Sequence, residues 1–261
     1  MKTVKHIAQL IEMGQFRRDK VKLFKDFVER AALSISVKVD PVHRTRRMQR
    51  LRKVETEHTP AELAEMDACL RTLAEEILEK TSNNLMEDIL GRAYEEHNLC
   101  DPGQDFTFPD VSRLVNALGF IGESTLPKCG FFDFYEHACG AGSIVLSAAE
   151  LLQSKGINYT NHFVVYANDI DEMCVHMAYV QISLHGIPAV VARANTITNE
   201  EFERWYTPQY IRGQWIIRRP FSGNSEADYQ LKCCTVPHYA AIQEALMLER
   251  QPNSNEGDEQ I

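Results

Sequence analysis

No apolar run in this sequence is long enough to span a bilayer, so we expect no membrane partner. The opening residues, MKTVKHIAQLIEMGQFRR, lack an apolar core followed by a small-residue cleavage site, and we expect no signal peptide. The seven cysteines are odd in number and contain no Cys-x-x-Cys pair that would indicate a zinc site. We therefore expect reduced thiols, no bound metal and a cytoplasmic location.

Charge is distributed unevenly along the chain. Residues 1–53 hold 15 Lys and Arg against 5 Asp and Glu, whereas the remainder holds 13 against 32. The densest basic run is HRTRRMQRLRK, residues 43–53, which indicates an anionic partner such as nucleic acid. A solvated helix face and an arm that pairs with the acidic body remain as alternatives. The candidate phosphate contacts are Arg44, Arg46, Arg47 and Arg50.

Helical patterns dominate the first hundred residues. Apolar residues at spacings of three and four predict a helix over 20–33, while the alternation in SISVKVD, 34–40, suggests a short strand or a loop. Residues 59–99 predict two helices interrupted near Ser82, the first opening with a capping box between Thr59 and Glu62. Its expected apolar stripe consists of Leu63, Met66, Leu70, Leu73, Ile77 and Leu78. We therefore predict a helical N-terminal region with a basic arm over residues 1–100.

The periodicity changes after a further predicted helix at 109–119. Strand-like runs at 131–138, 162–171 and 188–197 alternate with a helix after the first run and another over 172–186. This order predicts right-handed parallel crossovers and an α/β domain over residues 101–250. The polar, acidic stretch 251–261 is predicted to be a disordered tail.

The first strand leads into a glycine turn, EHACGAG, residues 136–142. Gly140 and Gly142 allow a sharp turn and a close approach of the backbone to a ligand. The helix that follows, from about Ser143, offers free N–H groups and a positive dipole end, which favour a phosphate or a carboxylate. Asp169, at the end of the second strand, can accept hydrogen bonds from ribose hydroxyls. These features describe both NAD-type and S-adenosylmethionine-type sites; Asp169 could instead cap a helix, a role for which Asp171 is better placed.

Several short stretches follow one another in an order that carries a resemblance. They are NLMEDILGRAYEEHNL (84–99), GQDFTFPDVSRLVNAL (103–118), EHACGAG (136–142), YANDID (166–171) and RANTIT (193–198). In this order they resemble the N6-adenine DNA methyltransferases related to the modification subunits of type I restriction systems. The resemblance covers roughly residues 84–200. It implies a Rossmann-like S-adenosylmethionine-dependent methyltransferase fold, complete or truncated, behind the helical N-terminal region.

The resemblance also implies roles for residues around the turn. Phe106, Thr107 and Phe108 would flank the methionine part of S-adenosylmethionine, and the backbone of residues 139–142 would hold its carboxylate. Asp169 would bind the ribose. The implied cofactor-binding residues are Phe106, Thr107, Phe108, Glu136, Ala138, Cys139, Gly140, Gly142, Asp169, Ile170 (adenine face) and Asn195 (adenine edge). Phe108 stands where the family has Pro, Glu136 where it has Asp, and Asn195 where it frequently has Asp.

The catalytic tetrad of that family, N-P-P-Y or N-P-P-F, does not occur in this sequence. The nearest candidate is QWIIRRPF, residues 214–221, in which a strand-like WII precedes RRPF. Arg218 would then replace the Asn, and Phe221 would keep the aromatic side chain. Arginine donates hydrogen bonds and accepts none, so it cannot take a proton from the adenine amino group.

Two hypotheses follow from these residues. The first is an S-adenosylmethionine-dependent DNA adenine-N6 methyltransferase of restriction-modification or phage type. The second is a catalytically inactive relative that binds S-adenosylmethionine or a partner subunit in a regulatory or anti-restriction role. DNA is the expected partner, together with a specificity subunit or a second copy of the chain.

Overall fold

A four-stranded mixed sheet lies at the centre of the α/β half of the protein. The computed structural model describes residues 2–14, 19–100, 106–119 and 126–218. Strands β1 (Phe132–Glu136), β2 (Phe163–Asp169), β3 (Ala189–Asn195) and β4 (Glu200–Tyr206) follow one another in that order across the sheet. The pairs β1–β2 and β2–β3 are parallel, whereas β4 runs antiparallel to β3. The three predicted strands and the mixed α/β fold class are confirmed.

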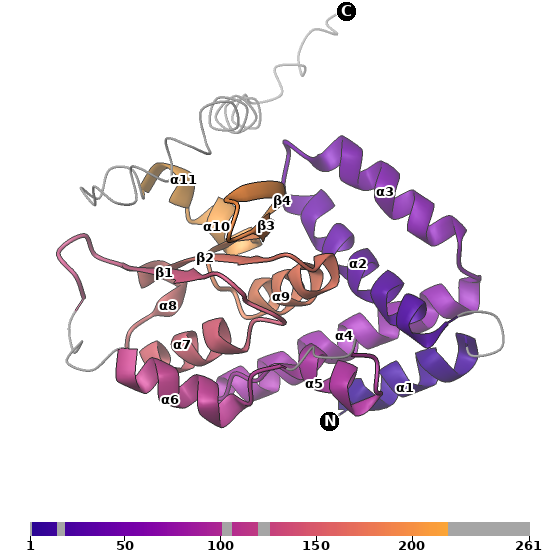
Figure 1. The fold of residues 1–261 in the computed structure, drawn as a ribbon, viewed down its shortest axis with the longest axis horizontal. Helices are drawn as coiled ribbons and strands as arrows, with labels where there is room; N and C mark the ends of the chain where they lie inside the picture. Colours follow the sequence, from indigo (N-terminus) through magenta and orange to yellow (C-terminus); the bar gives the residue numbers. More distant parts are fainter. Residues whose placement is uncertain (1, 15–18, 101–105, 120–125, 219–261) are drawn as a thin grey trace, which may run out of the picture.

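Helices cover both faces of this sheet (Figure 1). Helices α7 (Ser143–Ser154) and α9 (Glu172–Leu184) make the two crossovers, and α6 (Pro109–Gly119) lies beside α7 on the same side. The short helices α8 (Tyr159–His162), α10 (Pro208–Arg212) and α11 (Trp215–Arg218) complete the domain. Because side chains alternate along a strand, Phe163 and Val165 enter the larger core, while Val164 packs with Tyr210 and Trp215 on the opposite face.

The N-terminal region is helical, as predicted, and its described residues form five helices. They are α1 (Lys2–Gly14), α2 (Lys20–Val39), α3 (Arg44–Thr56), α4 (Pro60–Ser82) and α5 (Ile89–Glu96). The capping box of α4 is present, with the Thr59 and Glu62 side chains each bonding the other residue's backbone N–H. One buried cluster contains Ile7 and Phe24 from this region as well as Val145 from α7, so the helical region and the sheet share a core. The boundaries proposed at residues 100 and 250 remain a prediction.

Two local predictions in this region were wrong. The stretch 34–40 is neither strand nor loop, because α2 continues to Val39 and ends at Asp40. Its last turns are held by tertiary packing, since Leu33 and Ser36 are fully buried. Leu78 is 69% exposed and does not belong to the apolar stripe of α4. The buried row of α4 runs through Leu73 and Ile77, and the next residue turns away from it.

None of the helices in the described ranges is long and apolar enough to cross a membrane.

Candidate functional site

The glycine turn lies at the carboxyl ends of the parallel strands, the edge where open α/β sheets bind ligands. Gly140 and Gly142 have φ angles of +52° and +100°, which a residue with a side chain rarely adopts. The Cys139 N–H donates to the Asn168 carbonyl at 3.0 Å, which ties the turn to β2. Helix α7 then begins at Ser143, and its N-cap Gly142 provides no side chain to bond the N–H groups of the first turn.

Asp169 ends β2 directly beside this turn. Its carboxylate accepts the Gly140 N–H at 2.9 Å and the Asp171 N–H at 3.0 Å. These bonds fix the orientation of the carboxylate and leave it lone pairs for a ligand. The helix cap belongs to Asp171, whose side chain accepts the Met173 N–H at 2.9 Å. Asp169 and the first turn of α7 therefore present an acceptor and a set of donors close together.

A cavity of about 270 Å³ opens over the turn. Six predicted cofactor residues line it: Phe106, Thr107, Ala138, Cys139, Gly140 and Asp169. Four further residues line it: Ala141, Ser143, Ile144 and Cys174. Ala141 lies within the stretch 139–142 and Ser143 opens the helix expected to provide N–H groups, whereas Ile144 and Cys174 were missed by the sequence reasoning. Ile144 continues the turn into α7 and follows from helix geometry. Cys174 comes from α9, and nothing in the sequence pattern marks it.

The cavity does not include the other five predicted cofactor residues. Phe108 and Ile170 are 72% and 58% exposed and line neighbouring surfaces. The Glu136 carboxylate accepts the Ala138 N–H at 3.2 Å and supports the turn. Asn195 accepts the N–H groups of residues 197 and 198, which closes the loop after β3. Gly142 provides backbone groups only, at a φ of +100° that a residue with a side chain rarely adopts.

Cys139 lines the cavity as a neutral thiol. Burial, reinforced by the negative charge of Asp169, raises the pKa of the Cys139 thiol well above its usual value. A thiol with a raised pKa is a poor nucleophile. Cys139 therefore contributes shape and backbone groups to the cavity wall.

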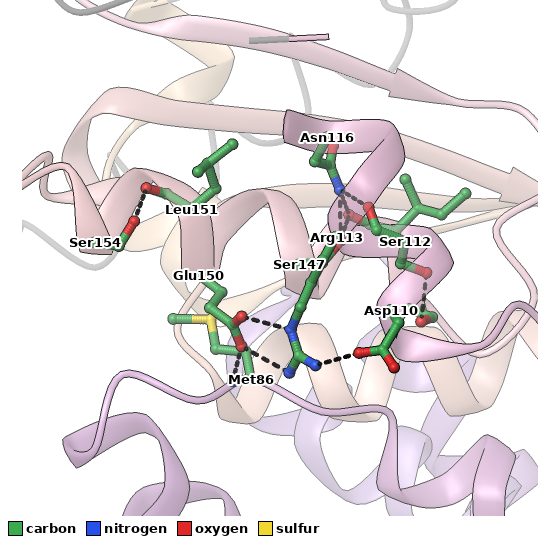
Figure 2. Close-up of polar contacts among 11 residues, drawn as sticks. Met86, Asp110, Ser112, Arg113, Asn116, Ser147, Glu150, Leu151 and Ser154 are labelled. Atoms are coloured by element: carbon green, nitrogen blue, oxygen red, sulfur yellow. Dashed lines mark hydrogen bonds and ion pairs between the residues drawn. The ribbon is translucent and has the colours of Figure 1, made fainter. Parts of the chain in front are cut away.

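Helix α6 reaches the site through its polar face (Figure 2). The Ser112 hydroxyl lies 2.9 Å from that of Ser143, and Asn116 donates to the Ile144 carbonyl at 2.9 Å. Arg113 donates to Glu150 of α7 at 2.8 Å. This docking places Phe106 and Thr107, which precede α6, against the cavity. The apolar residues of α6 instead face outward: Val111, Leu114, Val115 and Leu118 are 47–60% exposed.

Arg218 is not brought to this cavity. Residues 215–218 form a short helix rather than the expected strand. The Arg218 guanidinium stacks 4.0 Å from the Trp215 ring and donates to the Asn161 carbonyl at 3.1 Å. Asn161 precedes β2 while Asp169 ends it, so roughly 20 Å of strand separates the two ends. Phe221 lies outside the described residues.

The basic arm is divided between the interior and the surface. Arg47 is 1% exposed and bonds Asp40 at 2.6 Å. Arg50 pairs with Glu29 of α2, Glu172 of α9 and Glu203 of β4. The alternative of an arm that pairs with the acidic body thus describes Arg50, whereas Arg47 pairs with an acid of its own region. The other two candidates, Arg44 and Arg46, are exposed on α3.

One side-chain cluster among the described residues has metal-ligand geometry. Ligand atoms of Glu172, His176 and Glu203 lie within 4.8 Å of one another. However, Arg50 donates to Glu172 at 2.7 Å and to Glu203 at 3.2 Å. Its guanidinium already provides the positive charge that these carboxylates would otherwise take from a metal ion, so the cluster does not argue for a metal site.

Comparisons with known proteins found a family model and individual proteins that resemble this chain. The sequence profile of the family described as N-6 DNA Methylase matches residues 85–226. The type I restriction enzyme MpnII methylase subunit of Mycoplasma pneumoniae is 27% identical over 107 residues, which is 40% of this chain and 18% of that protein. The methyltransferase subunit of a type I restriction-modification system from Streptococcus thermophilus aligns with a TM-score of 0.41 at 14% identity, covering 75% of this chain and 58% of that one. The chain thus spans less than two thirds of each relative.

Proposed function

We propose, for a chain that belongs to the N-6 DNA methylase family, that the cavity over the glycine turn binds S-adenosylmethionine for the N6 methylation of adenine in DNA. The observation that supports this proposal is the cavity itself, in which the first turn of α7 and the carboxylate of Asp169 face a common space. S-adenosylmethionine carries a carboxylate and two ribose hydroxyls, which match these donors and this acceptor.

Each part of the cavity has a role in this proposal. The N–H groups of the first turn of α7 hold the methionine carboxylate. Asp169, oriented by Gly140 and Asp171, accepts the ribose hydroxyls. Phe106 and Thr107 form the wall beside the methionine chain and exclude water from it. When bound, the cofactor supplies an electrophilic methyl group.

A side-chain amide that could accept the adenine amino group is absent from the described residues that line this cavity. Methyl transfer to N6 needs a hydrogen-bond acceptor for the amino group and an aromatic face for the flipped base. Among the described residues that line the cavity, the one carboxylate is Asp169, which the ribose would occupy. Arg218 lies at the opposite end of the sheet. The placement of Arg218 favours a second candidate function, an S-adenosylmethionine-binding protein that acts with a partner subunit without transferring the methyl group itself.

Tritium transfer separates the two candidate functions. The protein is incubated with unmethylated DNA and S-adenosylmethionine that carries a tritiated methyl group. Incorporation at adenine N6 that is lost in Asp169→Ala is the result expected for the enzyme. Binding of the methyl donor without incorporation would establish the second candidate. Absence of both binding and incorporation would overturn the proposed function.

The turn offers a prediction with a matched control. Gly140→Ala forces a side chain into a left-handed backbone and places its Cβ 3.3 Å from the Phe106 ring. Gly156 has a similar φ of +74°, with no atom within 4 Å of an added Cβ. Both variants are expected to lose about 1–2 kcal/mol of unfolding free energy from backbone strain. Calorimetry should show weaker binding of S-adenosylmethionine in Gly140→Ala alone, because only that variant displaces the cavity wall; equal binding in both would contradict this.

The proposal also covers the partners of the protein and its cellular location. DNA is the partner we propose for the exposed Arg44 and Arg46, with a specificity subunit or a second copy completing the assembly. We propose a cytoplasmic location. Cys69 and Cys139 are free thiols, which a reducing compartment maintains.

A further inference from the structure

Gln181 of α9 is fully buried and lies between the glycine turn and helix α5. Its Nε2 donates to the Ala141 carbonyl at 2.9 Å and to Asp88 Oδ1 at 2.8 Å. Its Oε1 accepts the Ile89 N–H at 2.7 Å and the Leu90 N–H at 3.0 Å. A side-chain amide has two donor hydrogens and two acceptor lone pairs, so these four bonds use its full capacity. The side chain is therefore held in one orientation.

The other end of α5 contacts the opposite wall of the cavity. The Glu95 carboxylate accepts the Phe106 N–H at 3.2 Å. The Tyr94 ring meets the Phe106 ring edge to face, with centroids 6.0 Å apart. Phe106 in turn lies against Gly140, where an added Cβ would meet its ring at 3.3 Å. Helix α5 thus connects two cavity walls that are 35 residues apart in the sequence, Phe106 and Ala141.

The start of α5 is built around the carboxylate of Asp88, which Gln181 also bonds. Asp88 caps the helix by accepting the Gly91 N–H at 2.7 Å. A Cβ at Gly91 would lie 2.2 Å from Asp88 Oδ2, so only glycine fits beside this carboxylate. Glycine within a helix costs about 1 kcal/mol relative to alanine, which indicates that the placement of Asp88 matters to the fold.

We propose that Gln181 is a positioning residue for the methyl-donor site: by fixing the Ala141 carbonyl to the start of α5, it sets the distance between the glycine turn and the Phe106 wall. This inference rests on the proposed function for its ligand. In this arrangement α5 is a brace, meaning a rigid support between the glycine turn and the Phe106 wall. The cavity therefore keeps its shape only while the helical N-terminal region is docked. A change in that region is thereby transmitted to the donor site.

Amide hydrogen exchange in the full chain without ligand tests the brace independently of cofactor binding. Gln181→Leu fills a similar volume with an apolar side chain and removes all four bonds. We expect the bonded amides of the turn, Gly140 and Gly142, and that of Phe106 to exchange about tenfold faster than in the wild type, since a buried carbonyl loses its partner. Binding of S-adenosylmethionine, measured by titration calorimetry, is expected to weaken by a similar factor.

Gln153→Leu is the matched control. Gln153 is a half-buried glutamine at the far end of α7, and it donates to the Thr81 carbonyl at 3.2 Å and to Asn84 at 2.7 Å. Its loss removes a comparable link between helices and lowers the melting temperature. We expect exchange in the turn to stay at the wild-type rate. Equal acceleration in both glutamine variants would show general loosening and overturn the proposal.

A double swap separates the role at the turn from a merely structural role at α5. In D88N/Q181E, the new carboxylate still accepts the Ile89 and Leu90 N–H groups, and the new amide at position 88 donates to it. The Gly91 N–H loses its acceptor, because in the wild type it shares Asp88 Oδ1 with the Gln181 amide. The bond to the Ala141 carbonyl is lost as well. We expect the double variant to regain part of the stability that Gln181→Glu loses, while exchange in the turn stays fast.

The outcomes distinguish the two proposals. Wild-type turn exchange in D88N/Q181E, or in Gln181→Leu, would overturn the positioning role whatever the cofactor does. If the wild-type protein gives no heat with S-adenosylmethionine, the proposed function fails, while the exchange data still decide whether Gln181 holds the turn. Fast exchange together with an unchanged Kd would overturn the assignment of Gln181 to the donor site.

Discussion

Asp169→Ala is expected to weaken the binding of S-adenosylmethionine by at least about a hundredfold. A carboxylate that accepts two ribose hydroxyls makes two charge-assisted bonds, each worth about 1.5–3 kcal/mol. The substitution also removes the carboxylate that accepts the Gly140 N–H and the Asp171 N–H in the wild type. Both the contact with the ligand and the shape of the turn are therefore lost. Titration calorimetry with the purified full chain measures the change directly.

Two further variants separate the loss of the ligand contact from the loss of the shape of the glycine turn. Asp169→Asn keeps one carbonyl acceptor and should bind more tightly than Asp169→Ala. Asp171→Ala removes the cap of α9, at a cost of about 1 kcal/mol in stability, but leaves the backbone N–H that orients Asp169. Its affinity for the methyl donor should stay near that of the wild type. A wild-type Kd in Asp169→Ala would refute the assignment of Asp169 to the ribose.

The second large effect concerns Arg47, for which the expected loss is in folding. Arg47→Ala is expected to lower the free energy of unfolding by about 3–5 kcal/mol, because it breaks a buried ion pair and leaves the carboxylate only His43 and backbone N–H groups as partners. That carboxylate is Asp40, which is fully buried 2.6 Å from the guanidinium. The guanidinium also lies 3.9 Å over the Trp205 ring and donates to Ser36 and to the Arg204 carbonyl. Chemical denaturation followed by circular dichroism measures the loss.

Arg44 and Arg46 provide the contrast on the same helix. Both are exposed, so the double variant R44A/R46A should change stability by no more than about 0.5 kcal/mol per site. If the arm contacts DNA, this variant lowers DNA affinity and reduces the dependence of that affinity on salt concentration. A stable Arg47→Ala protein with weakened DNA binding would contradict the buried position. Unchanged DNA affinity in R44A/R46A would remove the proposed phosphate contacts.

The sequence determined the features that depend on near neighbours in the chain. The glycines of the turn, the capping box at Thr59 and Asp171 as the cap of α9 are local, because each acts within about four residues. The alternation of strand and helix after residue 130 likewise predicted the parallel order β1-β2-β3. From that order it followed that Gly140 and Asp169 meet at one edge of the sheet.

Tertiary structure decided whatever depends on partners far apart in the sequence. The charge count made Arg47 and Arg50 candidate phosphate contacts and left pairing with the acidic body open, and only the fold showed residues more than 120 positions away that bury or pair them. Stretch 34–40 alternates like a strand, yet burial against the core keeps it in helix α2. No sequence pattern marks Gln181 as a site residue, because helix α9 is buried on all sides. Its role exists only where α5, α9 and the glycine turn meet. A one-dimensional pattern records spacing and composition, whereas a buried bond is specified only when the folded chain brings both partners together.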